Sequence, residues 1–302
     1  MEKSSFAKYY YSLNQYLYDT FGEKVYKLSL DIGMTCPNRD GTKGIGGCIF
    51  CNGGSGEFAE SSCRGIETQL RLARQRVFNK TKAKKFIAYF QSYTNTYAPV
   101  SKLREVFDPI IRMDDIVALS IGTRPDCLGE DILDYLSELN RIKPIFVELG
   151  LQTIHGKTAK LINRCYETEE YFSACAKLKE IGINVVTHVI FGLPGEDEKM
   201  MLETIRQVGR VTDGIKMHVL YVLKGTELYR AHRDNLKLLS LEEYANLLIK
   251  SLDILPKSVV IHRLTGDPPK ALLEAPEWTK DKKRVLNYIN KELERHYSSS
   301  PA

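Results

Sequence analysis

The dominant feature of this 302-residue sequence is a regular alternation of short apolar runs with amphipathic segments. The runs are rich in β-branched and aromatic residues, which is typical of strands. Expected strands occupy residues 25–32, 85–92, 115–122, 144–151, 184–191 and 214–221, with 258–264 as a candidate seventh. Expected helices occupy residues 66–80, 100–112, 129–141, 168–181, 197–210 and 240–255. Strands that alternate with helices predict βα units and a parallel sheet, so the expected class is α/β.

The six or seven predicted strands look apolar on both faces, as in sheets that helices cover. No glycine-rich dinucleotide fingerprint follows the first strand, which disfavours a doubly wound nucleotide-binding fold. A β/α barrel is the better interpretation, and the length also leaves a complete eight-stranded barrel open. No linker divides the chain, so we expect one domain with short extensions at both ends.

The seven cysteines indicate where such a chain would work. Their number is odd and a chain of this length needs no disulfides, so we expect a reducing compartment and metal-ligating thiols. The N-terminus does not resemble a signal peptide and the apolar runs are too short to span a bilayer, so the expected location is cytoplasmic. The net charge of +5, from 43 basic and 38 acidic residues, permits an anionic partner without requiring one.

Three cysteines, Cys36, Cys48 and Cys51, lie in the glycine-rich loop CPNRDGTKGIGGCIFC that follows the first predicted strand. A structural zinc site would need a fourth ligand, for which Cys63 is the nearest candidate. A [4Fe–4S] cluster with three protein ligands would instead leave one iron open. The chemistry of a β/α barrel lies at the carboxyl ends of its strands, which favours a reactive cofactor here. A zinc-stabilised loop remains the alternative.

This loop resembles the cluster loop of radical S-adenosylmethionine (radical SAM) enzymes, in a variant with a longer first spacing. The likeness continues in order through YFQSYTNTYAP, SIGTRPDC, VELGLQTIH, INRCY, THVIFGLPGE and KMHVLYVLKGTEL. Within that superfamily the sequence is most similar to the YhcC/YtqA-type group, which is related to the Elongator catalytic subunit. The resemblance implies a partial (β/α)6-type TIM barrel over residues 25–225. A helical extension over 1–24 would precede it, and an extension over 226–302 would pack on the barrel.

The resemblance implies one [4Fe–4S] cluster on Cys36, Cys48 and Cys51, with S-adenosylmethionine bound at the open iron. Reductive cleavage of S-adenosylmethionine would give methionine and a 5′-deoxyadenosyl radical. The residues that would hold this cofactor are Phe50, Gln91, Glu148, Gln152, Arg164 and His188. Among them, Phe50 would lie against the adenine and Arg164 would pair with the carboxylate. Each also has a structural interpretation, such as a hydrogen-bonded core histidine at position 188.

Four cysteines remain outside the loop motif, at positions 63, 127, 165 and 175. Their spacing forms no compact ligand group, so we expect a single cluster. Cys175 lies beside two alanines on a predicted helix and is expected to fill the core. Cys63, just beyond the loop, is a candidate reactive thiol.

The resemblance also implies a tRNA-modifying enzyme that acts at C5 of the wobble uridine. It would convert carboxymethylaminomethyl-uridine to aminomethyl-uridine, a methyltransferase would act next, and a protein such as flavodoxin or ferredoxin would supply electrons. Basic stretches at 71–85, 230–237 and 280–296 are candidate RNA-binding surfaces, although such runs are often only solvated helix faces.

The candidate catalytic residues are His218 and Tyr221, together with Lys216. Residues that would contact a substrate carboxylate or phosphate are His262, Arg263 and Asp267. Two alternatives remain open at this point. One is a radical enzyme for a small molecule such as a tetrapyrrole, and the other is a zinc-stabilised binding protein.

Overall fold

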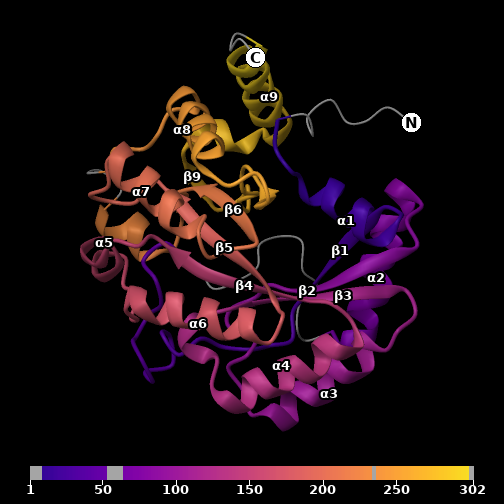
Figure 1. Ribbon diagram of the computed structural model, residues 1–302. Helices are drawn as coiled ribbons and strands as arrows, with labels where there is room; N and C mark the ends of the chain where they lie inside the picture. Colours follow the sequence, from indigo (N-terminus) through magenta and orange to yellow (C-terminus); the bar gives the residue numbers. More distant parts are fainter. Residues whose placement is uncertain (1–8, 53–63, 233–235, 299–302) are drawn as a thin grey trace.

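A curled sheet of seven parallel strands forms the centre of the molecule, and helices cover its outer face (Figure 1). The computed structural model describes residues 9–52, 64–232 and 236–298. The strands are β1 (Val25–Leu30), β2 (Lys85–Phe90), β3 (Ile116–Thr123), β4 (Ile145–Gln152), β5 (Asn184–Phe191), β6 (Gly214–Val219) and β8 (Val260–Arg263). They lie side by side in that order, and every neighbouring pair is parallel. The predicted α/β class and partial barrel are confirmed.

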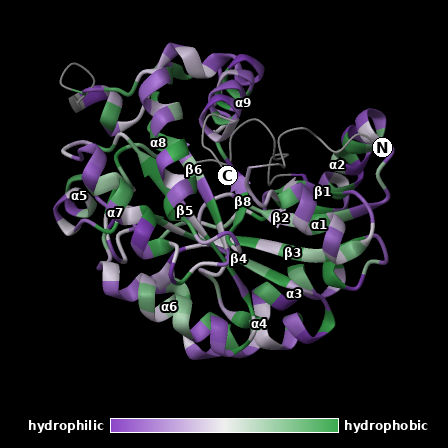
Figure 2. Cartoon of the chain, turned by 45° about the horizontal axis from the view of Figure 1, so that its top comes forward, coloured by the Kyte–Doolittle hydropathy of each residue, from purple (hydrophilic) through white to green (hydrophobic). Residues whose placement is uncertain are grey.

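Helices follow the strands as βα units require, and their apolar faces rest on the sheet. They are α2 (Ile66–Thr81), α3 (Val100–Ile111), α4 (Glu130–Ile142), α6 (Thr168–Glu180), α7 (Glu198–Val208) and α8 (Leu241–Ile254). The rings of Phe90, Phe107 and Tyr135 form a row from β2 through α3 to α4, with centroids 4.8 and 6.5 Å apart. Figure 2 shows the same division, with largely hydrophobic strands inside helices that carry both hydrophobic and hydrophilic stretches.

Local capping chemistry explains where the helices begin. Before α8, the Ser240 hydroxyl accepts the N–H of Glu243 at 3.1 Å, and the Glu243 carboxylate accepts the N–H of Ser240 at 2.8 Å. Before α7, the Asp197 carboxylate accepts the N–H of Met200 at 2.9 Å. These contacts satisfy amides that have no partner within the helix, so both helices start close to the predicted residues.

The inner face of the sheet changes character along the strands. Near the amino ends of the strands, apolar side chains pack together with Leu17 of α1 (Leu13–Phe21). This apolar floor consists of Val25, Ile87, Ala118, Phe146 and Val186. Two positions further along the same strands, and therefore on the same face, is a polar layer of Lys27, Tyr89, Ser120, Glu148 and His188. The barrel interior is thus apolar at one end and polar towards the other.

The two ends of the chain meet beside β8. The N–H of Ile261 donates to the carbonyl of Tyr11 at 2.8 Å, and Ser12 forms a parallel bridge with Ile261. The C-terminal segment therefore adds a seventh strand to the sheet, beyond packing on the barrel. It also supplies α9 (Lys282–Ser298) and β9 (Leu273–Ala275), which pairs with β7 (Val222–Leu223) and was not predicted. Within the residues that the structure describes, no helix is long and apolar enough to cross a membrane.

Candidate active site in the barrel interior

The cysteine loop follows β1 and lies at the carboxyl ends of the strands, as predicted. The N–H of Cys51 donates to the carbonyl of Cys48 at 2.9 Å, so the close pair of cysteines shares one tight turn. Gly46 and Gly47, just before this turn, have φ angles of +83° and +84°. Glycine adopts this conformation without a side-chain clash, which lets the chain return its second and third cysteines to the first.

The loop is held against the segment that follows α5 (Gly156–Leu161). The buried Asn38 amide donates to the carbonyl of Asn163, and the same nitrogen lies 3.6 Å from the Cys48 sulfur. In return, the Asn163 amide donates to the carbonyl of Gly47 at 2.8 Å. These two asparagines fix the loop backbone from opposite sides, and the sequence did not single out either of them.

The three thiols of the loop influence one another and a buried arginine. Burial and the neighbouring Cys51 raise the pKa of the Cys48 thiol to about 12, with a smaller contribution from Cys36, while Arg124 opposes the rise. The Arg124 guanidinium is held by Asp126 through two hydrogen bonds of 2.8 Å. In the described ranges, no three Cys, His, Asp or Glu side chains stand in metal-coordinating geometry. The three thiols therefore lie within electrostatic range of one another.

Two further cysteines lie beside the loop, which their sequence spacing did not predict. A Cβ added at Gly44 would lie 2.8 Å from the Cys165 sulfur, and Cys127 is within electrostatic range of Cys36. Cys175 is 1% exposed in the main core, as expected, whereas Cys63 lies outside the described residues.

The polar layer is centred on the fully buried carboxylate of Glu148. This residue is the fourth of eight in β4, so it lies within the strand and below the carboxyl end. Its carboxylate accepts hydrogen bonds from Lys27 of β1 at 2.7 Å and Ser120 of β3 at 2.6 Å. The His188 Nε2 of β5 lies 2.7 Å away, and the Lys216 ammonium of β6 forms a fourth contact. Five strands thus converge on one carboxylate.

The cations around Glu148 keep it ionised. Burial alone would raise its pKa, but Lys216, Lys27 and the hydrogen bond with His188 hold that pKa well below its usual range. Burial and the charge of Lys216 lower the pKa of His188 to about 4, against the opposing effect of Glu148. At neutral pH the network therefore contains a carboxylate and a neutral imidazole, which can donate its Nε2–H to that carboxylate.

His218 and Tyr221, the candidate catalytic residues, lie on the β6 side of the interior. The His218 ring centroid is 5.8 Å from that of His188, and the buried His218 Nε2 has no hydrogen-bond partner in the described part of the chain. Burial, with the nearby charge of Arg263, holds the pKa of His218 well below its usual range. The Tyr221 hydroxyl packs on Gly266, where a Cβ would lie 2.1 Å from it. An open hydrogen-bonding position on a neutral imidazole therefore faces the interior of the protein.

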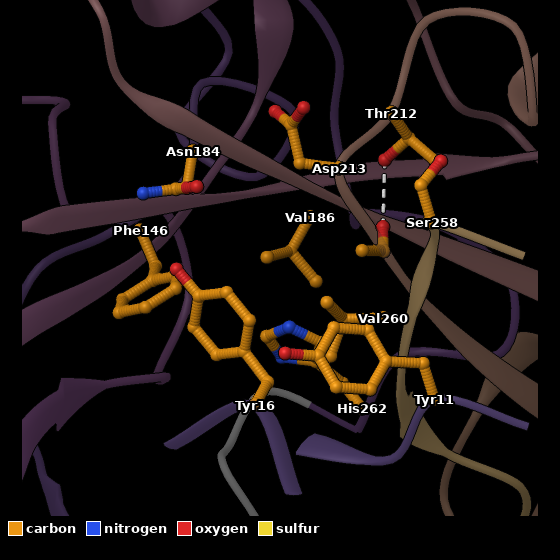
Figure 3. A pocket seen from close by; sticks show the side chains of 11 residues that line it. Tyr11, Tyr16, Phe146, Asn184, Val186, Thr212, Asp213, Ser258, Val260 and His262 are labelled. Carbon is orange, nitrogen blue, oxygen red and sulfur yellow. Dashed lines mark hydrogen bonds between the residues drawn. The ribbon is translucent and has the colours of Figure 1, made fainter. Parts of the chain in front are cut away.

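The structure also has a cavity at the other end of the barrel. A cavity of about 270 Å³ is lined by Tyr11, Tyr16 and His262 and by Phe146 and Val186 of the apolar floor (Figure 3). It therefore opens at the amino ends of the strands, beneath α1. Because β/α barrels carry their chemistry at the carboxyl ends, this cavity is not the candidate active site.

Comparison with known protein families shows which family has this cysteine loop and this barrel. Residues 35–208, more than half of the chain, match the Radical SAM superfamily, and residues 212–295 match the Radical_SAM C-terminal domain. This chain belongs to the radical SAM superfamily. The cofactors of this radical SAM enzyme are therefore a [4Fe–4S] cluster and S-adenosylmethionine.

Relatives of this radical SAM enzyme include YtqA of Bacillus subtilis, 46% identical over 98% of this chain and 92% of YtqA. YhcC of Escherichia coli is 36% identical over 91% of this chain and 89% of YhcC. The tRNA uridine(34) acetyltransferase of Methanocaldococcus infernus is 32% identical over 52% of this chain and 30% of its own length. The solved structure of Elp3 from that archaeon has a TM-score of 0.66 at 21% identity, covering 89% of this chain and 63% of Elp3.

The residues of the cysteine loop suit an iron–sulfur cluster by their chemistry. Three thiols in one loop supply the ligands such a cluster prefers, and three protein ligands would leave one iron for S-adenosylmethionine. The Asn38 amide beside the Cys48 sulfur could donate a hydrogen bond to that ligand, which is a usual means of tuning a cluster. The assignment of Cys36, Cys48 and Cys51 as the ligands stays a prediction.

Three of the predicted cofactor-binding residues lie at the carboxyl ends of the strands or in the cysteine loop. Gln91 follows the last residue of β2, and Gln152 ends β4 with a φ angle of +65°. Phe50, between two loop cysteines, is half-buried against a separate apolar cluster that includes Ile49 and Leu220. These positions are compatible with contacts to a bound cofactor, and their roles stay predictions.

Arg164 has a different environment from the one expected. Its guanidinium donates to the carbonyls of Leu151 at 3.0 Å, Thr153 at 2.6 Å and Tyr166 at 3.0 and 3.3 Å. A fifth bond of 2.9 Å goes to the Thr168 hydroxyl. Because all five N–H groups have protein acceptors, the structure gives Arg164 the role of bracing the loop after β4. A pairing with the cofactor carboxylate would require some of these bonds to be exchanged.

Proposed function

We propose that this radical SAM enzyme converts carboxymethylaminomethyl-uridine to aminomethyl-uridine at the wobble position of tRNA. The observation that carries this proposal is the cation-rich polar layer between the apolar floor and the cysteine loop. The carboxylate of the substrate side chain can be buried only at a site that provides cations and hydrogen-bond donors. The similarity to a tRNA uridine(34) acetyltransferase supports this choice of nucleoside. Since this chain covers 30% of that relative, acetyl transfer is not part of the proposal.

The residues of the chain would bind, orient and shield the substrate. When bound, the cofactors supply a radical that can remove hydrogen from a C–H bond next to nitrogen. The apolar floor would exclude water from the lower end of the barrel, so that hydrogen transfer competes with fewer side reactions. His218, neutral and with an open Nε2, would exchange a proton with the substrate amine, and Tyr221 would orient the side chain.

An anticodon base suits this site because it is unpaired and can enter a barrel without melting a duplex. The basic segments 71–85, 230–237 and 280–296 would bind the phosphates around it. A flavodoxin or ferredoxin would reduce the cluster, and a methyltransferase would act on the product. The superfamily membership decides against the zinc-stabilised binding protein considered from the sequence.

Nucleoside mass spectrometry of tRNA from a deletion strain tests the proposal. Carboxymethylaminomethyl-uridine should accumulate and should disappear when the wild-type gene is restored. The purified enzyme, reconstituted anaerobically and reduced with dithionite, should then convert that nucleoside in tRNA. An unchanged nucleoside profile would contradict the tRNA reaction and direct the search to small molecules such as tetrapyrroles.

A further inference from the structure

An irregularity between β6 and β8 turns two successive residues towards the barrel interior. The register shifts between Ile215 and Lys216 of β6, opposite the end of β8. The ring of His262 consequently lies 6.1 Å from that of Phe146 in the apolar floor. The next residue, Arg263, lies within electrostatic range of His218. In a regular strand, consecutive side chains would point to opposite faces.

Within the part of the chain that the structure describes, Arg263 differs from the other cations of the interior in having no hydrogen-bond or ion-pair partner. Its side chain is half-buried, yet among the described residues no acceptor forms a hydrogen bond or ion pair with it. The nearby carboxylates are already engaged. Glu148 has four partners, and Asp267 pairs with Lys282 at 2.7 Å. A half-buried guanidinium whose protein acceptors are all engaged elsewhere has N–H groups free to bind a ligand carboxylate.

The two lysines of the interior, in contrast, are compensated. Lys27 and Lys216 both contact Glu148, and their ammonium nitrogens lie 4.5 and 4.4 Å from the ring centroid of Tyr89. Two of the three basic side chains are therefore compensated by Glu148, and Arg263, which lies within electrostatic range of His188 and Lys216, is not among its partners. The open Nε2 of His218 lies in the same part of the interior.

We propose that Arg263 binds the carboxylate of the substrate side chain and that the His218 imidazole lies beside the bound group. This proposal rests on the proposed function, whose substrate carries such a carboxylate next to the reacting C–H bond. A guanidinium fork matches a carboxylate through two parallel hydrogen bonds, which would fix the orientation of the bond to be broken. Arg263 is therefore a specificity-determining residue, distinct from the residues around the cluster.

The test compares wild type, Arg263→Lys and Arg263→Gln as reconstituted full-length holoenzymes. Arg112→Gln, at an exposed arginine that follows α3, is the matched control. Binding is measured with tRNA that carries carboxymethylaminomethyl-uridine and with the same tRNA carrying unmodified uridine. Wild type and Arg112→Gln should prefer the modified tRNA by about 10-fold or more, and Arg263→Gln should lose that preference. Arg263→Lys should fall between them, and melting temperatures should agree within about 2 °C.

Three other outcomes would overturn the proposal, each for a different reason. Equal weakening of both tRNAs by Arg263→Gln, with a smaller salt dependence, would mean that Arg263 binds an RNA phosphate. A raised KM for S-adenosylmethionine in substrate-free cleavage, with the tRNA preference intact, would mean that it binds the cofactor carboxylate. A wild-type enzyme that neither prefers nor converts the modified tRNA would refute the proposed function itself, whatever the variants do.

Discussion

The cysteine loop and the polar layer occupy the same barrel, but different elements of the fold hold their side chains in place. In the polar layer, Glu148 has all of its partners in place across five strands. In the loop, the Asn38 amide bonds to the carbonyl of Asn163 and the Asn163 amide bonds to the carbonyl of Gly47, which holds the backbone. Strand register thus positions the polar layer, whereas hydrogen bonds between two connecting loops position the cysteines.

Removal of the three loop thiols should have the largest effect and should leave the barrel intact. Replacing Cys36, Cys48 and Cys51 together by Ala is expected to reduce bound iron and S-adenosylmethionine cleavage to background, because the cluster loses its ligands. Iron analysis and absorbance at about 400 nm would measure the bound cluster, and dithionite-driven cleavage of S-adenosylmethionine would measure the activity. The control Cys127→Ala should retain its iron. Cleavage by the triple variant would show that the ligand assignment is wrong.

Loss of the buried carboxylate should have the next largest effect, and it should act on stability. Glu148→Gln leaves Lys27 and Lys216 without their counter-charge, so the free energy of unfolding should fall by about 3–5 kcal/mol. The control is Glu198→Gln, which removes an exposed pair with Lys250 at 2.7 Å and should cost less than about 1 kcal/mol. Chemical denaturation measures both. Equal losses would mean that the polar layer is not a stabilising unit.

The stability of the polar layer should also depend on pH. The folded protein holds the pKa of His188 at about 4, below the value of about 6.5 expected for the unfolded chain. Between these two values the unfolded chain binds a proton that the folded chain does not. The free energy of unfolding should therefore fall as the pH drops from about 6.5 to 4, by on the order of 3 kcal/mol.

Protonation of Glu148 should add a further loss at lower pH, because its pKa is depressed in the folded state. Chemical denaturation at several pH values in this range gives the free energy of unfolding as a function of pH. That dependence should be weaker in His188→Gln than in wild type, and it should be unchanged in the exposed control His296→Gln. A wild-type stability that does not change between pH 6.5 and 4 would contradict the lowered pKa of His188.

A change in loop packing should have the smallest effect and should appear only at the cluster. A Cβ at Gly44 would lie 2.2 Å from the Asn38 side-chain oxygen, so Gly44→Ala must displace the asparagine that steadies the loop. Iron incorporation should fall several-fold while the melting temperature changes by less than about 3 °C. Gly156→Ala, where no atom lies within 4 Å of the added Cβ, should incorporate iron normally.

The fold was largely predictable because its signals are local. Each expected strand and helix is present to within a few residues, since hydrophobic spacing and caps such as Ser240 and Asp197 act over short distances. The position of the cysteine loop after β1 was predictable for the same reason, because the loop directly follows a clear apolar run. The unpredicted β7 and β9 are only two and three residues long, too short for an alternating pattern to be read.

The polar layer was not predictable because its partners are distant in the sequence. Lys27 and Glu148 are 121 residues apart, and they meet only through the register of the three strand pairs that connect β1 to β4. The resemblance therefore implied cofactor contacts for both Glu148 and Arg164, whereas tertiary contacts within the protein engage both side chains. The approach of Cys127 and Cys165 to the loop likewise depends on where the β3 and β4 connections fold.

The pairing of Tyr11 with Ile261 has a consequence for synthesis on the ribosome. The two residues are 250 positions apart. The N-terminal segment that contains Tyr11 therefore cannot form this contact until the ribosome has synthesised β8, near the end of the chain. At about 5–20 residues per second, that interval is roughly 12–50 seconds. During it the first strands and the nascent apolar floor lack their final neighbour. A trigger factor or another chaperone that shields this edge should therefore raise the yield of correctly folded enzyme.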